Sequence, residues 1–252
     1  MLTANELKYY SSLLKKKYRS AENKFIVEGK RFVDEGIKGD YDCELIIHTS
    51  KFDLSELSNY DIARSKKIRI EQIKTSEFRK LSDTKTPQNI AAVFHRKKYS
   101  TDYKNQALVV ALENISDPGN LGTIMRTCDW FGISHIIISG TSADLYNPKV
   151  LRSSMGSVFH VNAVCPDDFY GELSACKAAG YSIVCADLKG TNIYNYTPAG
   201  KVIIVFCSEA HGPGDNLRKL IDERVTIPRL GNAESLNVAS ASAVIISQLT
   251  QN

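Results

Sequence analysis

The apolar residues in the second half of this chain form short continuous runs, with helical spacing between them. Four runs are typical of strands covered on both faces by other elements, at 107–112, 135–139, 181–186 and 202–207. Helical spacing of apolar residues predicts helices at 120–131, 168–179 and 234–251. A short strand is expected at 225–228, where Pro228 ends it. Strands that alternate with helices in this way predict an α/β domain with a mostly parallel sheet.

The first part of the chain shows a weaker alternation of the same kind. We expect helices and strands there at 4–19, 24–29, 30–38, 43–48 and 88–94, of which the first and third are helices. The polar stretch that follows, HRKKYSTDYKNQ, has the composition of a linker. A chain of 252 residues has room for one or two domains. We therefore expect a smaller α/β domain at 1–95, a linker at 96–106 and a larger domain at 107–252.

Composition disfavours several classes of protein. No apolar run approaches the roughly 20 residues that a membrane-spanning helix needs. The N-terminal segment lacks the apolar core of a signal peptide, so we expect a cytoplasmic protein. The six cysteines include no CxxC pair and do not cluster with the five histidines. We therefore expect no metal site.

Positive charge is concentrated in the N-terminal part. Residues 1–105 contain 22 lysines and arginines against 15 acidic residues, whereas residues 106–252 contain 10 against 13. The densest group of basic residues consists of Lys8, Lys15, Lys16, Lys17, Arg19, Lys24, Lys30 and Arg31. Such clustering suggests contact with a polyanion, although a solvated helix face has the same composition.

Three segments combine polar residues and glycines next to apolar runs. In parallel α/β sheets, ligands lie beyond the carboxyl ends of the strands, where these segments are expected. In the first, the turn 117–119 leads into a helix, with Asn120 as a candidate N-cap. Arg126 lies six residues later in an otherwise apolar helix, where its charge has to reach solvent, a carboxylate or an anion. A structural role and an anion-binding role are both compatible with this position.

The second segment runs from a strand into Ser208-Glu209 and then Gly212, which allows close approach of the backbone. Taken alone, the glutamate is as compatible with a turn as with catalysis. In the third segment, a polar loop follows Ile227-Pro228, and Ser235 and Asn237 lie near the expected start of the last helix. A capped helix explains Ser235, whereas the amide of Asn237 between two apolar residues needs hydrogen-bond partners.

Together these segments resemble the three signature motifs of the SpoU (TrmH-like) family of RNA methyltransferases. The first motif matches Asp117, Pro118, Asn120, Gly122 and Arg126. The second matches Ser208, Glu209 and Gly212, and the third matches Ile227, Pro228, Ser235, Leu236 and Asn237. The segments 16–36 and 81–93 resemble the substrate-binding domain that many members carry. The resemblance covers nearly the whole chain.

The resemblance implies an enzyme that transfers a methyl group from S-adenosylmethionine to a ribose 2′-oxygen of RNA. It also implies a deep trefoil knot in the C-terminal domain, a preceding RNA-binding domain, and a homodimer formed through the C-terminal domain. The residues that it implies for catalysis are Arg126, Asn120, Glu209, Ser235 and Asn237. Those that it implies for cofactor binding are Cys207, Gly212, Ile227, Leu230 and Leu236. By analogy, we expect ribosomal RNA as the substrate in preference to transfer RNA.

One residue departs from the family pattern. Glycine usually precedes the serine–glutamate pair of the second motif, and this chain has Cys207 there. A small thiol can replace glycine where φ is negative. The affinity for the cofactor is the property that this substitution puts in question.

The role of Arg126 needs a separate argument. It has been proposed as the general base in this family, but an arginine side chain stays protonated in proteins. We therefore expect Arg126 to bind a phosphate of the target, with Glu209 and Asn237 orienting the arginine and the nucleotide. Two other hypotheses stay open, an RNA-binding protein of the same fold that has lost catalysis and a methyltransferase directed at transfer RNA. A nicotinamide-dependent oxidoreductase would need GxGxxG after its first strand, and NISDPGNLG lacks it.

Overall fold

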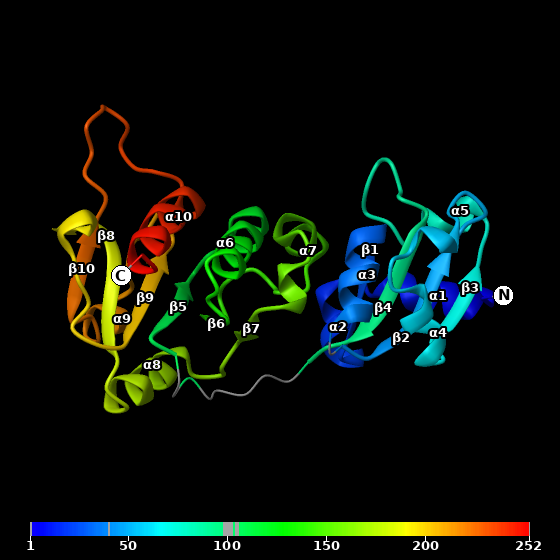
Figure 1. The fold of residues 1–252 in the computed structure, drawn as a ribbon, viewed down its shortest axis with the longest axis horizontal. Coiled ribbons are helices and arrows are strands. Elements are labelled where there is room, and N and C mark those ends of the chain that lie inside the picture. The colour runs from blue at the N-terminus through cyan, green and yellow to red at the C-terminus, as the bar shows by residue number, and fades with distance from the viewer. Residues whose placement is uncertain (1, 40, 98–102, 104–105, 252) are drawn as a thin grey trace. The chain divides into compact units, whose positions relative to one another are not determined.

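The computed structural model describes residues 2–39, 41–97, 103 and 106–251 and divides the chain into two compact units (Figure 1). The first unit comprises residues 1–98 together with 146–159, and the second comprises 99–145 and 160–252. The segment 146–159 therefore belongs to the first unit by its contacts, although it follows the predicted linker. Most of that linker, 96–106, lies outside the described residues, so the division into domains at this point stays a prediction.

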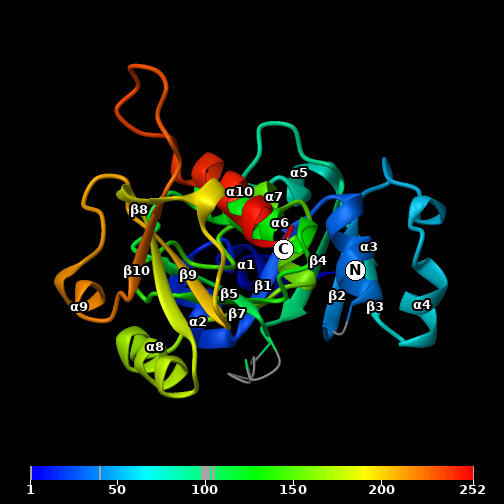
Figure 2. The ribbon, with the colours of Figure 1, turned by 60° about the vertical axis from the view of Figure 1, so that its left-hand side comes forward.

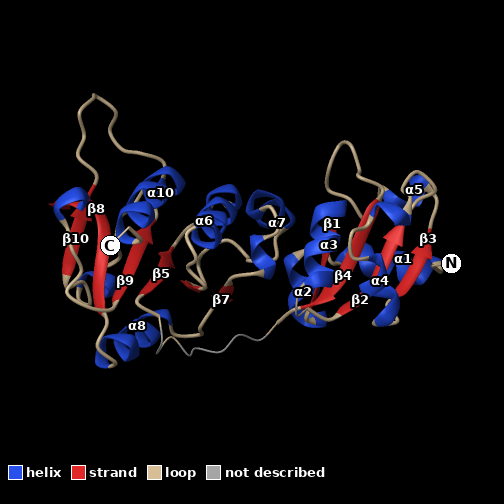
Figure 3. Cartoon of the chain, in the orientation of Figure 1, coloured by secondary structure: helices blue, strands red, loops and turns tan. Residues whose placement is uncertain are grey.

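The first unit is a small α/β fold. Its elements are α1 (Ala4–Ser12), α2 (Lys16–Glu22), β1 (Lys24–Glu28), α3 (Lys30–Lys38), β2 (Cys43–His48), η1 (Leu54–Glu56), α4 (Tyr60–Ser65), β3 (Arg69–Gln72), α5 (Thr75–Phe78), β4 (Ile90–His95), α7 (Pro148–Ser154) and η2 (Ser157–Phe159). Among the described residues, its sheet has four strands in the order β1-β4-β2-β3 (Figure 3). Strand β4 runs antiparallel to β1 and β2, and β2 and β3 are parallel.

The single helix predicted at 4–19 is wrong, because the chain forms two helices there, α1 and α2. Nη1 of Arg19 donates hydrogen bonds to the carbonyl oxygens of Leu13 and Leu14 between the two helices, at 2.9 and 2.8 Å. Arg19 is only 2% exposed. One member of the basic N-terminal group is therefore a structural residue that satisfies carbonyls at the end of a helix.

The segment 146–159 joins the first unit through aromatic packing. The rings of Tyr146 and Phe159 lie against Phe25, with centroids 4.4 and 6.2 Å from that ring. The hydroxyl of Tyr41 donates to the carbonyl oxygen of Val158 at 3.0 Å. These contacts fix the chain on both sides of α7.

The second unit is a parallel α/β fold, as predicted. Its elements are β5 (Leu108–Glu113), α6 (Pro118–Trp130), β6 (His135–Ile138), β7 (Asn162–Val164), α8 (Phe169–Ala178), β8 (Ser182–Asn192), η3 (Ile193–Asn195), β9 (Val202–Cys207), α9 (Asp215–Arg218), β10 (Glu223–Thr226) and α10 (Val238–Leu249). In its described part, the sheet has six strands in the order β10-β8-β9-β5-β6-β7, all parallel to their neighbours. Strand β7 was not expected from the sequence.

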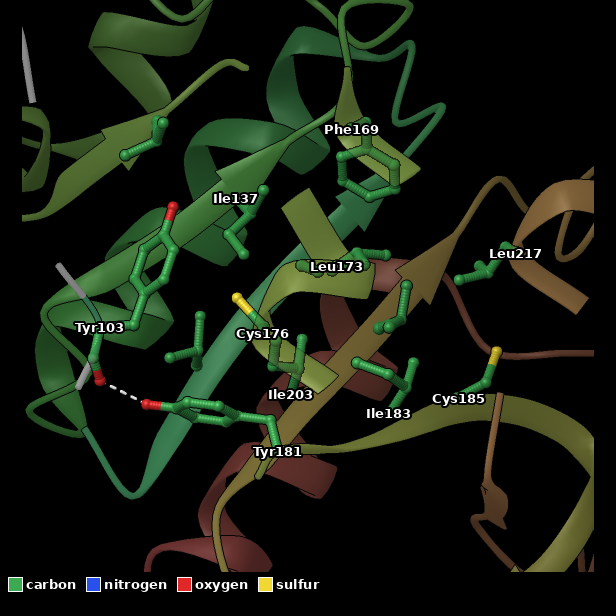
Figure 4. Close-up of a cluster of buried hydrophobic side chains, with 14 of the residues drawn as sticks. Tyr103, Ile137, Phe169, Leu173, Cys176, Tyr181, Ile183, Cys185, Ile203 and Leu217 are labelled. Atoms are coloured by element: carbon green, nitrogen blue, oxygen red, sulfur yellow. Dashed lines mark hydrogen bonds between the residues drawn. The ribbon is translucent and has the colours of Figure 1, made fainter. Parts of the chain in front are cut away.

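Helices cover both faces of this sheet. Helix α10 lies beside α6 on one face, and α8 packs on the other (Figure 2). On the α8 side, alternate strand residues such as Val109, Ile183 and Ile203 form a buried cluster with Leu173 of α8 (Figure 4). Continuous apolar strands are expected where a sheet is covered on both sides. None of the described helices of either unit is long and apolar enough to cross a membrane.

Candidate functional site

A cavity of about 440 Å³ opens at the carboxyl ends of β9 and β10. Its walls come from three stretches of the chain, 186–188, 206–213 and 226–241, with Ile245 of α10. All five residues that the resemblance implied for cofactor binding line it, namely Cys207, Gly212, Ile227, Leu230 and Leu236. Glu209 and Ser235 line it as well. Residues from the second and third motifs therefore meet at one site, where ligands are expected in parallel sheets.

The loop from β10 to α10 forms the outer wall of this cavity. It extends beyond the ends of the strands in Figure 1, where it is drawn in orange-red. Leu230 is fully exposed at 100%, and Leu236 is 48% exposed. Large apolar side chains of this exposure are available to cover an apolar ligand.

A bulge in β8 forms the opposite wall and was missed in the sequence. Strand β10 pairs Arg224 with Cys185 but the next residue, Val225, with Thr191, so residues 186–190 leave the ladder. The guanidinium of Arg224 binds the carboxylate of Asp187 within this bulge. The apolar run at 181–186 is also a parallel strand, so the rule that ligands lie beyond strand ends would have indicated this segment.

Cys207, the departure from the family pattern, meets the condition for replacing glycine. It ends β9 and is not among the residues with positive φ. Its thiol is buried, with Sγ 4.0 Å from Sγ of Cys185. The contact with Cys185 and burial together raise the pKa of the Cys207 thiol well above its ordinary value. The side chain is therefore a neutral group in the floor of the cavity.

The start of α6 differs from the prediction in a way that matters for the site. Asp117, rather than Asn120, is the N-cap, and its carboxylate accepts a hydrogen bond from the N–H of Asn120 at 2.9 Å. Pro118 occupies the first helical position, where its missing N–H costs nothing. Because Asp117 caps the helix, the side chain of Asn120 is left to make other contacts.

Three polar side chains, one from each motif, meet beside the cavity. Oε1 of Glu209 accepts hydrogen bonds from Nδ2 of Asn120 at 3.3 Å and from Nδ2 of Asn237 at 3.1 Å. Nδ2 of Asn237 also donates to Oδ1 of Asn120 at 3.1 Å. We call Asn120, Glu209 and Asn237 the amide–carboxylate cluster. Glu209 and Asn237 are exposed, so the cluster is open to a substrate.

Asn237 is held by both ends of its amide. Its Oδ1 accepts from the N–H of Ala239 at 2.9 Å, which makes Asn237 the N-cap of α10. The N–H of Val238 donates to Oε1 of Glu209 at 2.9 Å. The partners that the sequence required for this amide are therefore present. The predicted helix at 234–251 is wrong at its start, because the residues before Asn237 belong to the loop.

Arg126 forms no hydrogen bond with the amide–carboxylate cluster. It is exposed on α6, and within the described parts of the chain its side chain forms no hydrogen bond or ion pair. The expected contacts of Arg126 with Glu209 and Asn237 are thus not present, and Glu209 binds the two asparagines instead. An exposed guanidinium without a carboxylate partner is suited to binding an anion of a ligand. Among the described residues, no group of three or more histidine, cysteine or acidic side chains is placed to hold a metal ion.

Comparison with protein families covers most of the chain. The model of the SpoU rRNA Methylase family matches residues 107–247. The model of the MRM3-like substrate binding domain matches residues 4–92. The two matches together include every motif residue named above.

Individual relatives match over the full length. The chain is 31% identical to the 23S rRNA (guanosine(2553)-2′-O)-methyltransferase RlmP of Bacillus subtilis, over 97% of this chain and 95% of the relative. A TrmH-family protein from Porphyromonas gingivalis has a solved structure with a TM-score of 0.86 and 33% identity, covering 98% of both chains. The SpoU methyltransferase AviRb from Streptomyces viridochromogenes, solved in complex with S-adenosylmethionine, has a TM-score of 0.85 and 25% identity. That match covers 99% of this chain and 98% of AviRb.

Proposed function

This chain belongs to the SpoU rRNA methylase family, and on that premise we propose that it methylates ribosomal RNA at the amide–carboxylate cluster. It is an S-adenosylmethionine-dependent enzyme that transfers a methyl group to a ribose 2′-oxygen of RNA. The observation that carries the proposal is the meeting of all three motifs beside one cavity, through the contacts of Glu209 with Asn120 and Asn237. RlmP acts on 23S rRNA, which supports ribosomal RNA as the substrate.

The cavity fits S-adenosylmethionine in size and chemistry. Its volume of about 440 Å³ is in the range of small-molecule sites. Phe206, Ile227 and Leu236 supply an apolar wall for an adenine ring. Gly212, with φ 60°, has no side chain, so its backbone is accessible to the ligand. When bound, the cofactor supplies a methyl group on a cationic sulfonium for in-line displacement by an oxygen. We assign its binding to Cys207, Gly212, Ile227, Leu230 and Leu236.

The remaining residues position the RNA. We assign Arg126 to a phosphate of the target nucleotide, because its guanidinium is exposed and stays protonated. Asn120, Glu209, Asn237 and Ser235 orient the ribose. Alignment of two reactants can lower the activation barrier by about 7–11 kcal/mol. We therefore assign most of the rate enhancement to positioning. The phosphate held by Arg126 is the acceptor that we propose for the 2′-hydroxyl proton.

The test of the function is a comparison of RNA from wild-type and deletion strains. We expect one 2′-O-methyl nucleotide to disappear from ribosomal RNA and to return when the gene is restored. Loss from transfer RNA instead would overturn the choice of substrate. In calorimetry, S-adenosylmethionine should bind the purified protein equally well with and without EDTA. No binding at all would favour an RNA-binding protein that has lost catalysis.

We infer that the N-terminal lysines carry RNA affinity. Lys15, Lys16 and Lys17 are exposed, unlike Arg19. Each substitution of one of these lysines by alanine should flatten the log–log dependence of RNA affinity on salt by about 0.7, because one phosphate contact is lost. The matched control is Lys219→Ala, on an exposed lysine of the second unit. An unchanged slope in all three variants would contradict an RNA contact at this surface.

We also infer a homodimer formed through α6 and α10. Trp130, at the end of α6, is 82% exposed, and the adjacent α10 carries Ser240 and Ala243 on its less buried side. Aromatic residues such as tryptophan are enriched at protein interfaces. Trp130→Glu should convert the dimer to a 28.0 kDa monomer in sedimentation experiments at micromolar concentration. Tyr194→Glu, at another exposed aromatic residue of the same unit, is the control that should stay dimeric. A wild-type monomer would refute the inference.

The trefoil knot and a cytoplasmic location are parts of the same proposal. The knot is supported by the path of the chain after β10. Strand β10 is the edge strand beside β8, whereas α10 packs on α6 and β9. The loop at 227–237 therefore carries the chain past β8 to a position nearer the middle of the sheet.

A further inference from the structure

Glu113 is a buried carboxylate to which the reaction proposed above assigns no role. It is the last residue of β5 and is 0% exposed. Within the described residues, it forms no ion pair with a lysine, arginine or histidine. A buried carboxylate without a cation is costly unless hydrogen-bond donors surround it. The groups that donate hydrogen bonds to this carboxylate therefore indicate its role.

The backbone and the side chain of Glu113 hold opposite ends of one loop, and only the far end is held by the carboxylate. The carbonyl oxygen of Glu113 accepts from the N–H of Ser208 at 3.1 Å, where β9 ends. Its Oε2 accepts from the N–H of Gly214 at 3.0 Å, where α9 begins. The loop 208–214 is thus attached at its first and last residues to the same glutamate. Between these two points lie Glu209 and Gly212, which line the cavity.

The other carboxylate oxygen is held from the α8 side. Oε1 accepts from the hydroxyl of Tyr170 at 2.8 Å. Burial and this hydrogen bond raise the pKa of Tyr170 to about 12, so the hydroxyl stays a donor. A Cβ added to Gly214 would lie 3.0 Å from Oε1 of Glu113, so the loop approaches closely because that residue is glycine. Tyr170, Glu113 and Gly214 therefore form a tightly packed clamp.

We propose that Glu113 is a positioning residue for methyl transfer, which clamps the 208–214 loop so that Glu209 reaches Asn120 and Asn237. The inference rests on the proposed function of the amide–carboxylate cluster. Glu113 does not touch the cavity itself, since the 208–214 loop and Cys207 line it there. It acts through the loop: the backbone pairing of β5 with β9 fixes Ser208, and the carboxylate fixes Gly214, where α9 begins.

The first test removes the acceptors without leaving a large cavity. In Glu113→Met, both carboxylate contacts are lost, and kcat/KM should fall about 100-fold, the scale of a misplacement of about 1 Å. Glu113→Gln should remain within about tenfold of wild type, since its amide oxygen can accept from Gly214 while its nitrogen donates to Tyr170. Equal impairment of the two variants would show that charge rather than loop position matters and would overturn the proposal. So would a folded Glu113→Met protein with wild-type activity.

The second test keeps Glu113 and adds a methyl group at Gly214, where the loop contacts the carboxylate. Gly214→Ala needs no change of backbone, because φ is −68° there. Its methyl group should displace the loop, weaken S-adenosylmethionine binding and lower kcat about tenfold or more, with little change in Tm. Gly200→Ala is the control, because a Cβ there meets nothing within 4 Å. Wild-type cofactor affinity and kcat in Gly214→Ala would overturn the clamp even if Glu113→Met fails to fold.

Cofactor binding separates this inference from the proposed function. Calorimetry with S-adenosylmethionine measures the loop without any RNA. If the wild-type protein binds the cofactor but methylates no ribosomal RNA, the proposed substrate is wrong. The relative affinities of the variants for S-adenosylmethionine still test whether Glu113 holds the loop in place. A purely structural role for Glu113 would lower Tm in Glu113→Met and leave kcat of the folded protein unchanged, which would also overturn it.

Discussion

Replacing Arg126 by alanine should reduce methyl transfer by about 10²–10³, while cofactor binding and Tm stay at their wild-type values. The scale is that of removing one preorganised donor that stabilises charge in a transition state. The fold should tolerate the change, because the side chain is exposed and forms no hydrogen bond or ion pair with any of the described residues. Single-turnover assays with S-adenosylmethionine and ribosomal RNA measure the rate, and calorimetry measures the cofactor affinity.

Arg126→Lys distinguishes two ways of binding the phosphate. Lysine keeps the positive charge but loses the planar fork that gives two parallel hydrogen bonds. Near-complete rescue would mean a simple charge contact, and failure to rescue would mean bidentate geometry or a direct part in proton transfer. If the alanine variant methylates RNA at the wild-type rate, Arg126 is not a residue of the site.

Loss of the Glu209 carboxylate should also slow methyl transfer strongly. Its Oε1 is the common acceptor for Asn120, Asn237 and the N–H of Val238. In Glu209→Ala these donors lose their shared partner, which corresponds to about 1–3 kcal/mol and a fall in kcat of about 5- to 150-fold. Steady-state kinetics with varied RNA should place the loss in kcat more than in KM.

Glu209→Gln provides the matched control for this prediction. Glutamine has nearly the same shape, and its amide oxygen can still accept from the same donors. We expect it to retain most of the activity that the alanine variant loses. If glutamine is as inactive as alanine, the negative charge takes part in the reaction and a purely orienting role for Glu209 is refuted.

The sheet of the second unit could be predicted because its strands are buried on both faces. Runs such as 107–112 and 202–207 are apolar without interruption, which follows directly from that burial. The motif residues could be predicted to meet because each follows a strand of one parallel sheet. Strand β7 and helix α4 escaped prediction for the opposite reason. Strand β7 has three residues and α4 is largely exposed, so neither carries a clear apolar period.

The contacts within the site could not be predicted, because they join residues far apart in the chain. Glu209 lies 89 residues after Asn120 and 28 before Asn237, and no local pattern links them. Asn120 was a plausible N-cap by its type, but Asp117 caps the helix and so releases it. Glu113 was indistinguishable from a charged strand end, since its partners Tyr170 and Gly214 lie 57 and 101 residues later.

The membership of 146–159 in the first unit has a consequence for the exchange of domains between related proteins. The polypeptide passes from one unit to the other three times, near residues 98, 145 and 159. A chimera joined only in the 96–106 linker would present Tyr146 and Phe159 of one parent to the Phe25 position of the other. The first unit is therefore discontinuous, and a chimera that exchanges it has to take both 1–98 and 146–159 from the same parent.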